Sequence, residues 1–196
     1  FIASNIGGAQ LIGGLNESHL DILIESIDAD AIIVHLNPLQ ELMQPEGDRN
    51  FRGIEEGIKK LVEDSSIPVI VKETGAGITG EVAERLLQLG VSVIDVAGAG
   101  CTSWSKVENR RASNKDPEVI FDEWGVPTLK CLIEAQELRK LHDFELIASG
   151  GIRNGMDIAK ALCLGATFTA SAGPVIKAVV KEGSGGLERL YQKWTK

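Results

Sequence analysis

The sequence has little cysteine, no excess of basic residues and no long apolar run. Its three cysteines show neither a CxxC pair nor metal-ligand spacing, which argues against a disulfide framework and a zinc cage. Twenty Lys and Arg against 28 Asp and Glu give a formal charge of −8, whereas nucleic-acid binders carry a basic excess. No segment approaches the ~18 apolar residues of a membrane span, and residues 1–10 lack the features of a secretory signal. We therefore expect a cytoplasmic protein with neither nucleic acid nor a membrane as partner.

The composition is that of a globular domain, with two alternating sequence patterns. Apolar residues make up 43% of the 196 residues. Short apolar or β-branched runs alternate with longer stretches of helical periodicity, which indicates parallel strands joined by crossover helices. The strands are predicted at 1–5, 31–36, 68–73, 91–97, 145–149 and 167–171, and the helices at 17–27, 53–63, 80–89, 128–141, 155–164, 174–182 and 186–194. Six such units without a linker predict one domain over residues 1–196.

The segments between and within these patterns lead to two smaller expectations. Cys131 and Cys163 fall within helical patterns and are expected in the core. The segment 105–124 is rich in charge and is expected to form a long loop.

Two architectures fit a chain of βα units, namely a doubly wound sheet and a (β/α)8 TIM barrel. Polar residues end nearly every predicted strand, and a barrel builds its site from the carboxyl ends of all its strands, so the barrel is favoured. A barrel has eight units and typically ~250 residues. We therefore expect the first two βα units to be missing from the given chain.

The strongest local feature is the glycine-rich segment 145–155, which runs from a strand into a helix. Gly150 and Gly151 let the backbone approach an anion closely, the helix start offers free N–H groups, and Arg153 adds positive charge. The segment 170–174, Ala-Ser-Ala-Gly-Pro, repeats the theme one unit later. In barrels the last two such loops often share one phosphate. The pattern predicts a phosphate cup, although tight βα turns would also require these glycines.

Lys72 ends a predicted buried strand and needs a negative partner. An unpaired buried ammonium is costly, so the side chain must reach solvent or meet an anion. A bound anionic or electron-rich cofactor is one such partner, and a salt bridge to Glu73 or to a neighbouring strand's carboxylate is the structural alternative.

The motif His-Leu-Asn-Pro-Leu-Gln-Glu at 35–41 follows another strand. Strand alternation puts His35 and Asn37 on one face, and a turn at Pro38 carries Gln40 and Glu41 above the barrel mouth. A single carboxylate near a phosphate site suits Mg²⁺, which takes one or two carboxylates together with phosphates and waters. The alternative is a solvated polar loop.

A third strand end, at 95–104, contains two glycines followed by Cys101 and Thr102. Thr102 can hydrogen-bond a ligand. Cys101 could act as a nucleophile if its pKa were lowered, although a small buried cysteine is commoner.

Taken together, these motifs resemble the type 2 isopentenyl-diphosphate isomerases. The resemblance rests on segments 4–7, 35–41, 44–47, 71–77, 95–104, 124–128 and 149–155, and it spans nearly the whole chain. The glycine-rich segments are shared with other FMN barrels, whereas 35–41 together with Gln-Pro-Glu-Gly at 44–47 is more particular to this family. Relative to that family, the first two strands and the carboxyl-terminal end are absent from the given chain.

The resemblance implies a homo-oligomeric barrel enzyme that interconverts isopentenyl and dimethylallyl diphosphates, with reduced FMN, Mg²⁺ and NAD(P)H as reductant. It implies FMN contacts for Asn5, Lys72, Thr102, Gly150, Gly151, Arg153, Ala172 and Gly173. Gln40 would be catalytic and would face the substrate with His35 and Asn37, and Glu41 would bind Mg²⁺.

Two departures from the family and two alternative functions are kept open. Cys101 stands where family members usually have glycine, and Ala97 where some have serine. One alternative is another FMN or nucleotide barrel, either similar to IMP dehydrogenase with Cys101 as nucleophile or oxidising a 2-hydroxy acid. The other is a flavin-binding scaffold without turnover.

Overall fold

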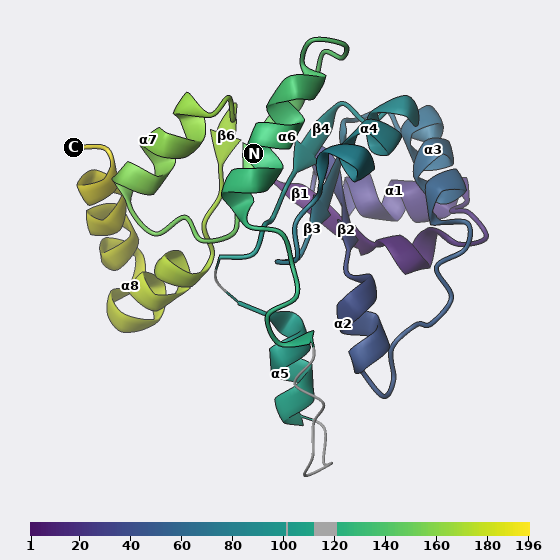
Figure 1. Cartoon of the computed structure of the whole chain (residues 1–196). Coiled ribbons are helices and arrows are strands. Elements are labelled where there is room, and N and C mark those ends of the chain that lie inside the picture. Colours follow the sequence, from purple (N-terminus) through teal and green to yellow (C-terminus); the bar gives the residue numbers. More distant parts are fainter. Residues whose placement is uncertain (101, 112–120) are drawn as a thin grey trace.

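The core of the protein is a parallel sheet of six strands (Figure 1). The computed structural model describes residues 1–100, 102–111 and 121–196. The strands are β1 (Ala3–Gly7), β2 (Ala31–Leu36), β3 (Val69–Glu73), β4 (Val93–Asp95), β5 (Glu145–Ala148) and β6 (Phe168–Thr169). Each overlaps a predicted strand, because these short runs are apolar on both faces and bounded by turns.

The order of the strands in the sheet decides between the two predicted architectures. Neighbours follow the chain from β1 to β6 without a reversal, and every pair is parallel. A doubly wound sheet reverses its order at a switch point, whereas a barrel does not. Right-handed crossovers in one continuous order place the connecting helices on one face of the sheet. The fold is therefore of the TIM-barrel type, as predicted, with six βα units in this chain.

The helices lie close to their predicted positions. They are α1 (Glu17–Glu25), α3 (Ile54–Asp64), α4 (Gly80–Gln88), α6 (Thr128–Leu138), α7 (Gly155–Cys163) and α8 (Gly173–Trp194), with a short 3-10 helix η1 (Gly8–Leu11) after β1. Helix α8 is broken at Gly183, whose φ of 61° and ψ of −153° are not helical, so the two predicted helices at 174–182 and 186–194 are also present. Leu86, Ile94, Leu132 and Leu146 are fully or nearly fully buried in the core between sheet and helices.

Three expectations were wrong. The turn expected at Pro38 is a helix, α2 (Pro38–Met43), because proline at the first helical position needs no N–H partner and its φ already suits a helix. The first part of the expected loop 105–124 is a helix, α5 (Trp104–Arg111), and residues 112–120 lie outside the described part. Cys131 is buried as expected, but Cys163 is exposed at the end of α7.

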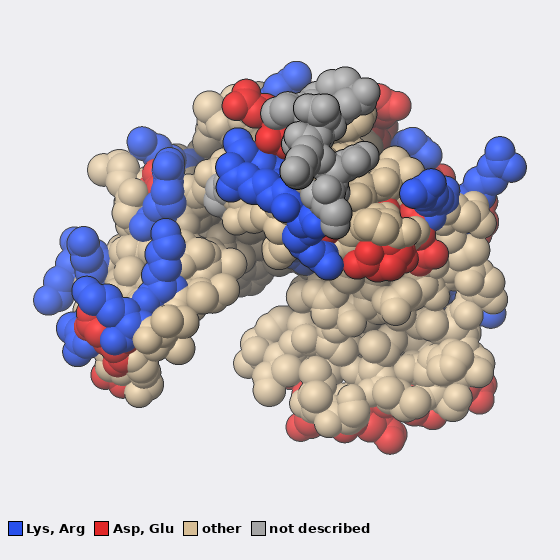
Figure 2. Space-filling model, turned by 90° about the horizontal axis from the view of Figure 1, so that it is seen from below, with Lys and Arg blue, Asp and Glu red and all other residues tan. Residues whose placement is uncertain are grey.

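The carboxyl edge of the sheet carries α2 and α5, which project together below it (Figure 1). Viewed from this side, the surface is hollowed between the C-terminal helices and the rest of the molecule (Figure 2). Among the described residues, no helix combines the length and the apolar character that crossing a bilayer requires.

Candidate active site

A cavity of about 630 Å³ lies at the carboxyl ends of the strands. Its walls come from every strand end of the sheet, from Asn5 of β1 to the segment after β6. Eleven of the twelve residues singled out in the sequence line it: Asn5, His35, Asn37, Gln40, Lys72, Thr102, Gly150, Gly151, Arg153, Ala172 and Gly173. The twelfth, Glu41, is not a lining residue but is hydrogen-bonded to one. The sheet therefore gathers side chains that are up to 168 positions apart in the chain.

One row of the sheet places three polar side chains next to one another. His35, Lys72 and Asp95 are register partners on β2, β3 and β4. Because neighbouring parallel strands bring their carboxyl ends to one edge, all three face the same cavity. The row forms the polar floor of the site.

The ammonium group of Lys72 does not pair with the Glu73 carboxylate, which was one of the contacts considered from the sequence. Its Nζ donates a hydrogen bond to the backbone oxygen of Glu73, at 2.6 Å, rather than to the Glu73 carboxylate. The carboxylate instead accepts backbone N–H groups of residues 74–77. The ammonium group of Lys72 therefore lies at the cavity, and it has three N–H donors, of which this hydrogen bond uses one.

Asp95 is a buried carboxylate that the sequence reasoning left without a role. It is 5% exposed and accepts hydrogen bonds from Ser149 Oγ at 2.6 Å and from the backbone N–H of Ala97 at 3.1 Å. Burial raises the pKa of Asp95, while the Ser149 hydrogen bond and the charge of Lys72 oppose the rise. Asp95 ties the end of β4 to the end of β5. Asp95 is a polar residue at the end of an otherwise apolar strand, and this pattern could have indicated a role for it.

The predicted phosphate cup is formed by two loops in contact. Gly150 and Gly151 have φ values of +87° and +81°, which only glycine adopts freely. Helix α7 follows, with Asn154 Oδ1 accepting the N–H of Asp157. The loop after β6 is attached to this one by a hydrogen bond from Ser171 Oγ to the oxygen of Ile152, at 2.6 Å.

Two features of this cup favour an anion. The start of α8 has no capping side chain, so the N–H groups of Gly173 and Val175 are not capped by a side chain, while Pro174 between them has no N–H. Arg153 contributes a largely exposed guanidinium, 3.6 Å from the carboxylate of Asp157. Lys72 also lines the cavity, so among the described lining residues two cationic side chains occur in a chain whose net charge is −8.

His35 is held in one orientation by the neighbouring strand. Its Nδ1 lies 2.6 Å from Asn5 Oδ1, so the ring donates to the amide oxygen and presents Nε2 as an acceptor. Burial and then the charge of Lys72 lower the pKa of His35, and the charge of Glu41 opposes them. The ring is therefore a neutral hydrogen-bonding group at pH 7.

Glu41 is fixed by two hydrogen bonds at the start of α2. Oε1 accepts the Asn37 amide at 2.8 Å, and Oε2 accepts the backbone N–H of Asp48 at 3.0 Å. Within the described residues no group of three or more metal-binding side chains occurs. Glu41 thus contributes one oriented carboxylate beside the cavity.

The sequence reasoning missed a buried ionic cluster that joins α2 to α5. Glu108 is 3% exposed; its Oε1 accepts from Gln44 Nε2 at 3.1 Å and its Oε2 from Arg111 at 2.7 Å. The cluster packs the helix that carries Gln40 and Glu41 against α5. Ser103, whose Oγ accepts the N–H of Lys106, was the signal for this helix, since serine is a preferred N-cap.

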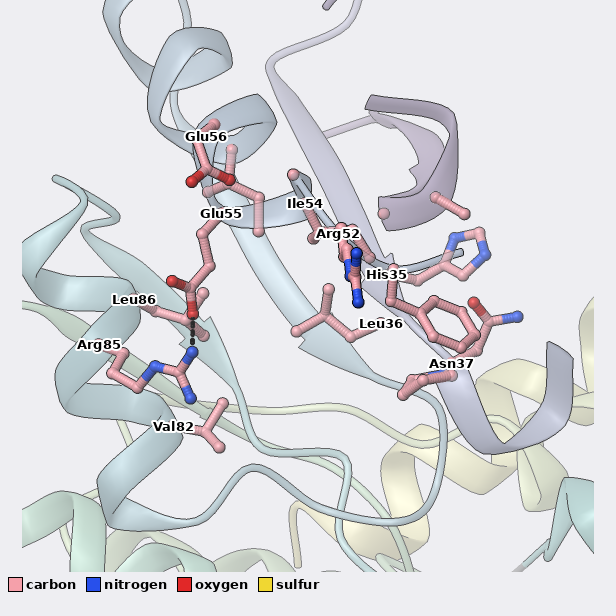
Figure 3. Close-up of a pocket in the computed structure, with 16 residues that line it drawn as sticks. His35, Leu36, Asn37, Arg52, Ile54, Glu55, Glu56, Val82, Arg85 and Leu86 are labelled. Carbon is pink, nitrogen blue, oxygen red and sulfur yellow. Dashed lines mark hydrogen bonds and ion pairs between the residues drawn. The ribbon is translucent and has the colours of Figure 1, made fainter. Parts of the chain in front are cut away.

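A second cavity, of about 460 Å³, lies between α3, α4 and the end of β2 (Figure 3). His35 and Asn37 line both cavities. An ion pair between Arg85 and Glu55 joins the two helices across it (Figure 3). The rest of its lining is mostly apolar, including Leu36.

Cys101, the proposed nucleophile of the alternative function, lies outside the described residues. Thr102 beside it lines the first cavity and is exposed.

The fold and this site define a parallel βα-barrel protein with two glycine-containing loops in contact at the carboxyl ends of its strands. A family model described as FMN-dependent dehydrogenase matches residues 36–196, and the chain belongs to that family. Among curated proteins it is 47% identical to the isopentenyl-diphosphate delta-isomerase of Chlorobium limicola, over 98% of this chain and 56% of that protein. It is 44% identical to that of Stutzerimonas stutzeri (91% and 52%) and 47% to that of Pseudescherichia vulneris (89% and 51%). These relatives confirm the resemblance seen in the sequence.

The chain spans about half the length of the curated relatives it matches. Among solved structures it is similar to a GMP reductase variant from Trypanosoma brucei, with a TM-score of 0.58 and 18% identity over 96% of this chain and 42% of that one. That likeness supports the barrel fold.

Proposed function

We propose that this chain carries the catalytic site of an isomerase that interconverts isopentenyl and dimethylallyl diphosphates, with no net redox change. Reduced FMN and Mg²⁺ would be required, and NAD(P)H would serve as the reductant. The observation that carries the proposal is the meeting of Asn5, His35, Gln40 and Lys72 with the glycine cup in one cavity. The names of the curated relatives support it. A homo-oligomeric state and a cytoplasmic location belong to the same proposal.

The residues of the cavity suit FMN. Its volume lies within the roughly 300–1,000 Å³ of small-molecule sites. Gly150, Gly151 and Arg153 would hold the phosphate together with Ala172 and Gly173 at the start of α8. Asn5, Lys72 and Thr102 would contact the rest of the cofactor, with the ammonium group stabilising the negative charge of the reduced form. When bound in that form, FMN supplies a proton donor and acceptor at a ring nitrogen.

The remaining residues would bind and orient the substrate. Gln40 would face the alkene and assist the proton transfer, with His35 and Asn37 lining the same region. The His35 ring, kept neutral and attached to Asn5, offers a hydrogen bond without adding a charge beside a hydrocarbon. An unactivated alkene needs a well-placed acid and then a base, so the walls act mainly by positioning and by excluding water.

Glu41 would hold Mg²⁺, which would supply positive charge for binding the substrate diphosphate. Both of its carboxylate oxygens already accept one hydrogen bond, and each has a further lone pair for a cation. These bonds fix the carboxylate before the metal arrives. The anchored diphosphate then holds the reacting end of the substrate in the cavity.

The decisive test is deuterium uptake from D₂O into isopentenyl diphosphate under anaerobic conditions, with the complete gene product, reduced FMN and Mg²⁺. Each component is omitted in turn. Uptake and formation of dimethylallyl diphosphate that require all three are expected, and Gln40→Ala should abolish them while FMN stays bound. A flavin-loaded, folded protein that shows no exchange would refute the proposal.

A second candidate is an oxidoreductase of the same fold, with Cys101 as nucleophile or with a 2-hydroxy acid as substrate. The description of the matching family as a dehydrogenase favours it. Cys101→Ala distinguishes the two, because it should abolish turnover only if the cysteine is the nucleophile. The motif at 35–41 would have no role in that reaction. The inert flavin-binding scaffold predicts weak FMN binding and no turnover with any of these substrates.

A further inference from the structure

Glu73, at the end of β3, uses its carboxylate to organise a loop rather than to bind solvent or a cation. The residue is 8% exposed. Its Oε2 accepts the backbone N–H groups of Thr74 at 2.6 Å, Gly75 at 2.6 Å, Gly77 at 3.3 Å and also Ala76. One charged oxygen thus satisfies four successive donors. A charged acceptor makes hydrogen bonds roughly twice as strong as a neutral one.

The loop held in this way contacts the connection between β4 and α6 at two points. The oxygen of Ala76 accepts the N–H of Val126 at 2.7 Å. Gly75, with φ of +140°, packs so closely on Thr102 that a Cβ would lie 2.8 Å from its backbone oxygen. The position of Thr102 therefore depends on the shape of the loop 74–77.

Glu73 also contacts Lys72, through its backbone oxygen. The ammonium group donates to the backbone oxygen of Glu73, whose peptide plane leads directly into the loop. Lys72, Thr74, Gly75 and Thr102 line the cavity, whereas Glu73 does not. Glu73 therefore makes its contacts with the cavity through these neighbours.

We propose that Glu73 is a positioning residue that sets Lys72 and Thr102 against the flavin. This inference rests on the proposed function, because it takes FMN as the molecule in the cavity. The Glu73 carboxylate holds the loop 74–77 through four N–H groups, and this loop together with the Glu73 backbone oxygen fixes where Lys72 and Thr102 meet the cofactor. Neutralising Glu73 should therefore weaken FMN binding and disfavour its reduced, negatively charged form.

The test compares Glu73→Gln and Glu73→Asp with wild type in the complete gene product. The glutamine variant removes the charge, and the aspartate variant keeps the charge but shortens the reach. The matched control is Glu145→Gln, at the exposed start of β5 and away from the cavity. Fluorescence titration measures the Kd of FMN, and equilibration with redox dyes measures the reduction potential of the bound flavin. We expect Glu73→Gln to raise the Kd of FMN about tenfold, because the loss of one charge-assisted hydrogen bond changes a Kd by about this factor. We also expect it to lower the reduction potential of the bound flavin.

A cycle with Lys72→Met separates positioning from a general loss of structure. If Glu73 acts through Lys72, adding Glu73→Gln to Lys72→Met should leave the potential where Lys72→Met alone puts it. Wild-type potential and affinity in a folded Glu73→Gln protein would overturn the inference while leaving the proposed function intact. Failure of both Glu73 variants to fold would also overturn it, since the carboxylate would then be structural only. If wild-type protein does not bind FMN, the proposed function itself fails.

Discussion

Replacing Gly150 by alanine should destabilise the protein far more than the same change at Gly13. The two glycines have nearly equal φ values, +87° and +89°. This conformation costs an L-residue about 1–2 kcal/mol, partly offset by the lower entropy of an unfolded chain with alanine. No atom lies within 4 Å of a Cβ added at Gly13, whereas one added at Gly150 would lie 2.0 Å from the oxygen of Gly98. Gly13→Ala therefore measures the free-energy cost of the positive φ alone, without a steric contact.

The difference between the two variants can be worked from the contacts. To accommodate a Cβ at Gly150, the loops after β4 and β5 must separate. That breaks the hydrogen bond from Gly98 N to Ser149 O, at 3.1 Å, and the one that the single Thr128 hydroxyl hydrogen shares between Ser149 O and Gly150 O, at 3.1 and 2.6 Å. Two bonds at about 1 kcal/mol each, added to a backbone cost of about 1 kcal/mol, give a loss of about 3 kcal/mol for Gly150→Ala, against about 1 kcal/mol for Gly13→Ala.

Urea denaturation measures both losses as shifts of the midpoint at a constant slope. Flavin titration of the two folded variants gives a second readout, because only Gly150→Ala opens the cup. Equal midpoints for the two variants, or unchanged FMN affinity in Gly150→Ala, would refute the reasoning from loop contact.

Three further changes test individual groups of the cavity. Glu41→Gln should lower isomerase activity most at limiting Mg²⁺ and leave FMN affinity unchanged; an unaltered Mg²⁺ dependence would exclude the metal role. The pKa of Asp95 is raised in the folded state, so above pH 3.8 the unfolded state releases a proton that the folded state still holds. The free energy of unfolding therefore falls as pH rises from 3.8 to the pKa of the folded state. Asp95→Asn should accordingly be more resistant to urea than wild type at pH 7 and lose that advantage at pH 3; a constant difference would contradict this. Because the pKa of His35 is lowered in the folded state, the unfolded state takes up a proton below pH 6.5 before the folded state does, and wild type loses stability on acidification. His35→Gln should therefore reduce the dependence of the urea midpoint on pH below 6.5. Identical slopes in the two proteins would show that His35 does not titrate in this way.

Much of the sheet could be predicted because its strands are continuous apolar runs. Residues 31–36 form a strand with the predicted bounds. The predicted strand 91–97 is shorter, Val93–Asp95, because Ala97 has a φ of +38° and leaves the extended region. This positive φ follows from contacts with the neighbouring loop, which periodicity does not reveal.

The convergence of the site was also predictable, since polar residues at the ends of parallel strands meet at one edge. The partners of those residues were not. The Glu73 carboxylate was considered as a salt-bridge partner for Lys72, whereas it accepts hydrogen bonds from four N–H groups of the loop that follows it. In the sequence, Glu108 is one of several charged residues between 105 and 124, and nothing distinguishes it as buried. Its burial results from the packing of α5 on α2. Such contacts depend on how separate units approach one another.

The close approach of Gly98 to Gly150 has a consequence for how this barrel can change over evolution or by design. Each strand end contributes its own loop, so a single loop can in principle be exchanged between related barrels. The loops at 97–100 and 149–151 are an exception, because the backbone of each fills the space beside the other. A graft or recombination point that separates them would bring together two loops that have not been selected to fit. These two segments should therefore be transplanted, and inherited, as a pair.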